Sequence, residues 1–128
     1  MSAGKILVVD DETRIVDILD KFLTRKGFEV EKAYDGEKGL GILKKDKSID
    51  LIILDEKMPN MSGTAMCKEM EKLKINVPII ILTGSLSLLD AKDLRGISYD
   101  HVLIKPIRLS ELMKLLEKIL TGSRKKRT

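Results

Sequence analysis

Short apolar runs without charged residues dominate this sequence. Three of them are continuous rather than alternating: Ile6–Val9, Leu51–Leu54 and Val77–Leu82. Continuous runs of this length are typical of strands that are covered on both faces, as in parallel sheets. Two further strands are predicted at Phe28–Ala33, whose alternation suits a sheet edge, and at Val102–Ile104.

The stretches between these runs have helical periodicity. The first places its apolar residues on one stripe before Gly27 ends the helix: Ile15, Ile18, Leu19, Phe22 and Leu23. Further helices are expected at 36–45, from near residue 62, at 86–95 and at 109–120. Strand and helix alternate throughout, which predicts an α/β fold with right-handed crossovers. We expect a doubly wound, flavodoxin-like fold: a five-stranded parallel sheet of order 2-1-3-4-5 with five helices.

Length and composition favour one domain. The 128 residues suffice for a single core, and we divide them into a domain at 1–121 and a basic tail or linker start at 122–128. Much of the net charge of +4 lies in that tail, and only two Tyr and two Phe are present, so direct nucleic-acid binding by this chain is not expected. A single cysteine, Cys67, excludes an internal disulfide. With no room for a signal peptide and no run long enough to span a bilayer, we expect a cytoplasmic protein.

Polar side chains stand where the predicted strands end. Asp10 and Asp11 follow the first strand, Asp55 the third, Thr83 the fourth and Lys105 the fifth. Ligands of open parallel sheets bind at the carboxyl ends of strands, at the point where strand order reverses. Taken one at a time, the aspartate pair suits a helix cap and the threonine suits a turn. Together, these residues favour a binding site.

Three carboxylates in one pocket repel one another unless a cation lies among them. Magnesium prefers oxygen ligands and usually retains waters and a phosphate oxygen. Acidic groups, a magnesium ion, a hydroxyl and a lysine suit phosphoryl transfer, in which an aspartate can act as the nucleophile. Asp55 is the best candidate nucleophile, because its strand is central and Asp10 and Asp11 are then left to bind the metal.

At these residues the chain resembles the receiver domain of two-component response regulators, the CheY-like family. Its markers read "LVVDDE", "LIILDEKMPNMSG", "IIILTG" and "LIKPI", and the resemblance runs from Lys5 to about Leu120. The order and spacing of these motifs are highly specific, whereas an isolated pair of aspartates would not be. The fold of that family agrees with the fold predicted above.

The resemblance implies a role for each site residue. Asp55 resembles the phospho-accepting aspartate, and Asp10 and Asp11 resemble the acidic pair that holds Mg²⁺. The backbone carbonyl of Lys57 stands where the family has a further metal ligand. Thr83 matches the hydroxyl that bonds the phosphoryl group. The two remaining matches are Lys105, which pairs with a phosphoryl oxygen, and Pro106, which is reached through a cis bond.

The resemblance also implies partners. A sensor histidine kinase or a phosphotransfer protein would donate the phosphoryl group, and the altered face around the fourth helix and fifth strand would engage a downstream effector that the sequence does not identify. A phosphorylation-dependent dimer is compatible with this behaviour. Such a protein is a switch that catalyses only its own phosphorylation and dephosphorylation, not a classical enzyme.

One residue departs from the family pattern. The position three residues before Lys105 often carries a tyrosine or phenylalanine that turns inward, and here it is Val102. We therefore predict that phosphorylation changes residues 84–95 without an inward turn of the side chain at position 102, which here is a valine.

Other functions remain open from the sequence alone. A haloacid-dehalogenase-like phosphatase needs an Asp-x-Asp pattern, whereas the acids here are adjacent and Glu12 follows them. A flavin- or nucleotide-binding module needs a glycine-rich loop after the first strand, which is absent. A degenerate receiver acting only as a scaffold is disfavoured by the complete set of Asp10, Asp11, Asp55, Thr83 and Lys105.

Overall fold

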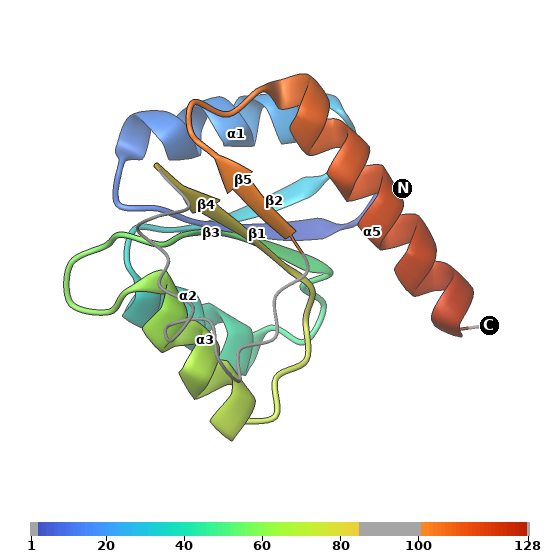
Figure 1. Ribbon diagram of the computed structural model, residues 1–128. Helices are drawn as coiled ribbons and strands as arrows, with labels where there is room; N and C mark the ends of the chain where they lie inside the picture. The colour runs from blue at the N-terminus through green and yellow to red at the C-terminus, as the bar shows by residue number, and fades with distance from the viewer. Residues whose placement is uncertain (1–2, 85–100, 128) are drawn as a thin grey trace.

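The computed structural model describes residues 3–84 and 101–127 and shows a sheet between two layers of helices (Figure 1). The strands are β1 (Lys5–Val9), β2 (Glu29–Ala33), β3 (Leu51–Asp55), β4 (Ile79–Thr83) and β5 (His101–Ile104). All neighbouring strands pair in parallel, in the order β2-β1-β3-β4-β5. The predicted sheet and its order are therefore confirmed.

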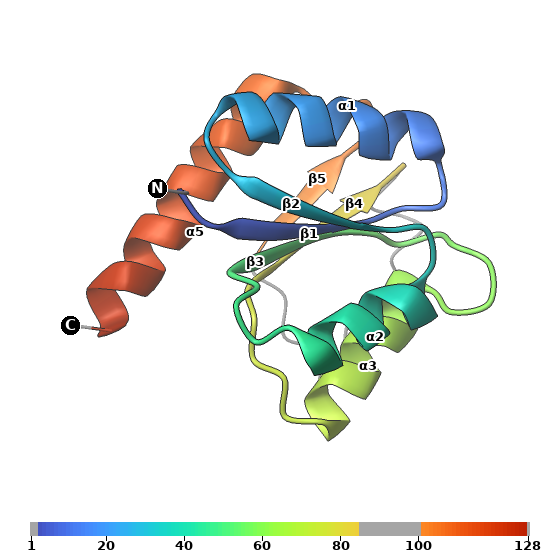
Figure 2. The ribbon, with the colours of Figure 1, turned by 180° about the vertical axis from the view of Figure 1, so that it is seen from behind.

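Helices cover both faces of this sheet. They are α1 (Thr13–Arg25), α2 (Gly36–Lys45), α3 (Gly63–Lys72) and α5 (Leu109–Arg127). Figures 1 and 2 show α1 and α5 on one face and α2 and α3 on the other. The helix predicted at 86–95 lies outside the described residues.

Each face of the sheet has its own apolar core, which explains the continuous runs. In β3, Leu51 and Ile53 belong to the core beneath α1 and α5. The alternate residues Ile52 and Leu54 belong to the core beneath α2 and α3. All four are fully buried, so polar alternation within this strand would place a polar side chain in one of the two cores.

Some predicted details are wrong. Ile18 was placed on the buried stripe of α1, but 53% of its surface is exposed, and Val16 is buried in its place. The fourth strand begins at Ile79 rather than Val77 and includes Thr83 as its last residue. These are errors in the position of a side chain and of an element boundary, and the architecture is unaffected.

The basic tail continues a helix. Helix α5 extends to Arg127, so residues 123–127 prolong it beyond the apolar stripe that packs on the sheet. The division of the chain at residue 121 stays a prediction. Within the described residues, we find no helix with both the length and the apolar character needed to cross a membrane.

Candidate functional site

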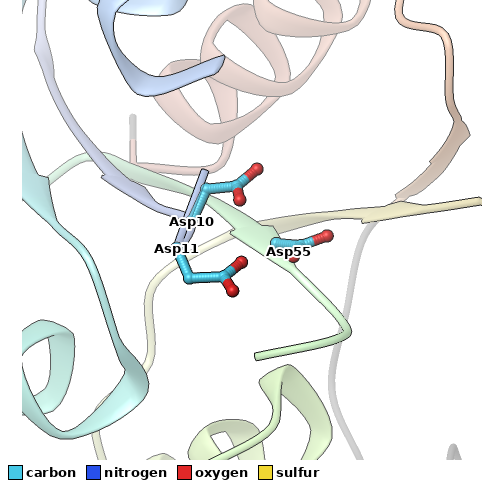
Figure 3. Close-up of side chains that lie close together, drawn as sticks. All are labelled: Asp10, Asp11 and Asp55. Atoms are coloured by element: carbon cyan, nitrogen blue, oxygen red, sulfur yellow. The ribbon is translucent and has the colours of Figure 1, made fainter. Parts of the chain in front are cut away.

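Three carboxylates meet at the carboxyl ends of β1 and β3. Asp10 and Asp11 directly follow β1, and Asp55 is the last residue of β3. The two strands are paired in register, with Val9 opposite Leu54. Each aspartate offers one oxygen that lies within 4.8 Å of the others. Figure 3 shows the three side chains pointing to the same side of the strand ends, so the predicted acidic cluster is present.

Asp10 is the most deeply buried acid of this cluster. Its side chain is inaccessible to solvent, and Oδ1 accepts a hydrogen bond from the Glu12 N–H at 2.9 Å. The other oxygen, Oδ2, is buried and has no hydrogen-bond partner among the described residues. Burial raises the pKa of Asp10 to about 6, and the nearby charge of Asp55 adds to this effect.

Lys105 provides the positive charge of the site. Its Nζ lies 3.0 Å from Asp55 Oδ1 and 3.6 Å from Asp10 Oδ2. Burial alone would lower the pKa of Lys105, but the hydrogen bond to Asp55 and the surrounding acids raise it. The peptide bond to Pro106 is cis, as the resemblance implied, and the Lys105 N–H donates to the Thr83 carbonyl at 2.7 Å.

Asp55 combines burial with a charged partner. Its side chain is almost fully buried, and burial raises its pKa, while the hydrogen bond from Lys105 acts in the opposite direction. The carboxylate is thus partly desolvated and held by a single lysine. Such a group is more nucleophilic than a fully hydrated carboxylate, and it is already oriented.

The remaining predicted site residues lie around one cavity of about 510 Å³. Its walls include Asp11, Asp55, Lys57, Thr83 and Lys105. Thr83 is buried at the end of β4, and Lys57 is exposed. The cavity therefore brings the predicted nucleophile, hydroxyl, lysine and metal-ligand position to one space.

Sequence reasoning missed a fourth acid at this site. Glu12 lines the cavity, and its Oε1 lies 3.5 Å from Lys105 Nζ. The only sequence signal was its position directly after Asp10 and Asp11. Asp10, Glu12 and Asp55 thus lie around Lys105, and Asp11 lines the same cavity as this lysine.

The connection between β3 and α3 forms one wall of the cavity. Glu56 follows Asp55 and accepts two hydrogen bonds from Thr64, with N–H to Oε2 and Oγ1 to Oε1 both at 3.1 Å. The Gly63 N–H donates to the Glu56 carbonyl at 2.9 Å. A Cβ at Gly63 would lie 2.6 Å from the Asp55 carbonyl oxygen, so only glycine fits here without a shift of backbone. These contacts involving Glu56 were not predicted.

The geometry suits a divalent cation with oxygen ligands. Three carboxylate oxygens converge, one buried oxygen lacks a hydrogen-bond partner among the described residues, and the cluster holds more negative than positive charge. Mg²⁺ is bound in proteins through one or two carboxylates together with waters and phosphate oxygens. The residues present therefore fit the predicted ion.

A parallel sheet of this order, with acidic residues at the carboxyl ends of β1 and β3, is the arrangement expected of a receiver domain. Residues 6–117 match the family model for the response regulator receiver domain. The chain belongs to this family, the receiver domains of two-component systems.

Individual relatives agree with this assignment. The chain is 41% identical over 110 residues to the uncharacterized transcriptional regulatory protein YrkP of Bacillus subtilis, covering 86% of this chain and 46% of the relative. It is 36% identical over 119 residues to the alkaline phosphatase synthesis transcriptional regulatory protein PhoP of the same species, covering 93% of this chain and 49% of the relative. The chain spans about half the length of these curated relatives.

Solved structures show the same fold. A CheY-like receiver domain protein from Methanospirillum hungatei has a TM-score of 0.89 and 30% identity, covering 98% of this chain and 99% of that chain. The response regulator TrrA of Thermotoga maritima, solved in complex with Mg²⁺ and BeF, has a TM-score of 0.81 and 32% identity, covering 91% of this chain and 99% of that chain.

Proposed function

We propose that this chain is a phosphorylation-dependent switch that accepts a phosphoryl group on Asp55. The observation that supports this most directly is the position of the Asp55 carboxylate. It lies 3.0 Å from Lys105 Nζ and within 4.8 Å of an oxygen of Asp10 and of Asp11, and it lines a cavity that also includes Thr83. The family and the Mg²⁺–BeF complex of a relative are consistent with this assignment.

The proposed reaction is a single displacement at phosphorus. An oxygen of the Asp55 carboxylate forms a bond to the phosphorus of the donor, and the bond between phosphorus and the leaving group of the donor breaks. The product is an acyl phosphate on Asp55, and the leaving group departs with the electron pair of the broken bond. Water later cleaves the acyl phosphate and restores the carboxylate.

The other site residues stabilise charge in this step. Lys105 would pair with a phosphoryl oxygen, because its Nζ is already held beside Asp55. The hydroxyl of Thr83 would bond another phosphoryl oxygen from the adjacent strand end. Asp10, Asp11, Asp55 and the backbone carbonyl of Lys57 would hold Mg²⁺. When bound, this ion neutralises charge on the transferring phosphoryl group.

The proposed partners follow from this chemistry. A histidine kinase or phosphotransfer protein would be the donor, and a downstream effector would read the phosphorylated form. The added charge would bias an equilibrium between two packings around Thr83. The predicted response at residues 84–95 lies outside the described residues and stays a prediction.

Intact mass spectrometry tests the proposal directly. The protein is incubated with acetyl phosphate and Mg²⁺, and we expect one phosphoryl adduct. The adduct should be absent in Asp55→Asn and in wild-type protein treated with EDTA. An adduct of equal yield in Asp55→Asn would reject Asp55 as the acceptor.

A further inference from the structure

Glu56 forms hydrogen bonds at both ends of the loop between β3 and α3. This loop contains Lys57, whose backbone carbonyl is the proposed metal ligand. Residues 57–62 connect β3 to α3 and contain no helix or strand. The N–H of Glu56 donates to the Leu82 carbonyl at 3.0 Å, which ties the start of the loop to β4. Its carbonyl and its carboxylate bind the first residues of α3. The start and the end of the loop are therefore held together at one residue.

Both carboxylate oxygens of Glu56 are used in this contact. Oε2 accepts from the backbone of Thr64 and Oε1 accepts from its hydroxyl, and Thr64 is buried. Ser62 caps the same helix through a separate bond, in which its Oγ accepts from the Ala65 N–H at 3.1 Å. Because the α3 N-terminus already has a cap, the Glu56 contact adds a tie between the loop and the helix.

The tie is made at Glu56, the residue directly before Lys57. Lys57, whose carbonyl is the proposed ligand, has Glu56 on one side and the connecting loop on the other. We infer that the Glu56–Thr64 pair is a positioning device that holds the Lys57 carbonyl at the metal site beside Asp55. This inference rests on the proposed function for the identity of the ligand position. It assigns Glu56 and Thr64 a role that the acidic cluster alone does not give them.

Mg²⁺ titration of the unphosphorylated protein tests the inference, with isothermal calorimetry as the readout. Loss of a group that orients a metal ligand typically weakens metal binding about 10- to 100-fold. For Glu56→Ala we expect the dissociation constant for Mg²⁺ to rise about tenfold. Thr64→Val keeps the charge of Glu56 and the Thr64 backbone bond but removes the hydroxyl, so a smaller rise is expected. Thr64→Ser retains the hydroxyl and should bind Mg²⁺ like the wild type.

Asp46→Ala is the matched control for a general loss of stability. Asp46 pairs with Lys5, at the amino end of β1 and thus at the far end of the strand from Asp10. This variant should be less stable and bind Mg²⁺ as the wild type does. Amide exchange at Thr64, measured without metal, should accelerate in Glu56→Ala.

The outcomes separate the two proposals. If Thr64→Val binds Mg²⁺ with wild-type affinity, the bond from the Thr64 hydroxyl does not position the metal ligand, and the role inferred for this pair of side chains is overturned. Wild-type affinity in both variants also overturns it and leaves a helix-capping role. Failure of the protein to accept a phosphoryl group would overturn the proposed function, but the Mg²⁺ comparison would still decide the role of the pair.

Discussion

At the scale of single residues, the site is built from groups whose charges are poorly matched without a ligand. Asp10 is fully buried, with Oδ2 lacking a hydrogen-bond partner among the described residues. Lys105 contacts Asp10, Glu12 and Asp55 at once, and so divides one positive charge among several acids. Such an arrangement lowers the stability of the metal-free protein, and it prepares the site for a cation.

Asp10→Asn should stabilise the metal-free protein at neutral pH. The folded-state pKa of Asp10 is raised from 3.8 to about 6, so the folded state binds more protons than the unfolded state in this window. The contribution of Asp10 to stability therefore decreases as the pH rises from about 4 to about 6. We expect Asp10→Asn to increase the free energy of unfolding by about 1–3 kcal/mol at pH 7.5.

Urea unfolding in EDTA measures this effect. The gain from Asp10→Asn should shrink toward zero as the pH falls to 3.5, where Asp10 is protonated in the folded wild-type protein and mostly protonated in the unfolded one. Asp35→Asn, outside the cluster at the N-cap of α2, is the control and should show little change. A wild-type protein more stable than Asp10→Asn at pH 7.5 would contradict the prediction.

Lys105→Met should alter both Asp55 and the reaction. Removing a cation 3.0 Å from Oδ1 leaves burial unopposed, so the pKa of Asp55 should rise further. Carbon NMR titration of the aspartate carboxyl groups measures this shift. Phosphorylation by acetyl phosphate should slow by about a hundredfold, as when one preorganised donor is removed. An unchanged rate of phosphorylation in Lys105→Met would show that Lys105 does not stabilise the charge of the transferring phosphoryl group.

At the scale of secondary structure elements, helix α2 shows that its glycines have different roles. A Cβ at Gly39 would lie 2.9 Å from Val9 Cγ2 and 3.3 Å from Met66 Cε and Sδ. At Gly41, a Cβ would meet no atom within 4 Å. Close packing of α2 on β1 and α3 therefore requires glycine at position 39 but not at position 41.

Alanine substitutions should separate the two glycines. Gly41→Ala should stabilise the protein by about 0.5–1 kcal/mol, since alanine is the better helix former and has space here. Gly39→Ala gains the same propensity but overpacks the core, and we expect a net loss of about 1–2 kcal/mol. Thermal unfolding of both variants measures the difference. A stabilising Gly39→Ala would show that Val9 and Met66 move aside readily.

The sequence predicts elements better than it predicts side-chain partners, for physical reasons. Continuous apolar runs reveal strands that are buried on both faces, and strand ends then place Asp10, Asp55 and Lys105 at one edge. Helical periodicity leaves the width of an apolar stripe undetermined, so Ile18 was wrongly placed in the core. The bonds between Glu56 and Thr64 arise from an irregular loop, in which no repeat indicates which side chains meet.

At the scale of the whole molecule, metal binding and folding should be linked. The acidic cluster exists only when β1 and β3 are paired, so the unfolded chain lacks the site. A ligand that binds only the folded state adds about 2.7 kcal/mol at a concentration one hundred times its dissociation constant.

Mg²⁺ should therefore raise the unfolding temperature of the wild-type protein. The increase should be much smaller in the double variant Asp10→Asn, Asp11→Asn, which has lost two of the three carboxylates. Differential scanning calorimetry at matched ionic strength, with NaCl as the control salt, measures this. An equal increase in the double variant would place the stabilising ion elsewhere.

The wholly parallel sheet has a consequence during synthesis on the ribosome. Asp10 is made first, Asp55 next and Lys105 last of the three, yet all three meet at one rim. A nascent chain that has not yet released β5 from the exit tunnel lacks the lysine of the site. Competence to accept a phosphoryl group should thus be acquired only after Lys105 has left the tunnel, so that nascent chains without this lysine consume little of the donor.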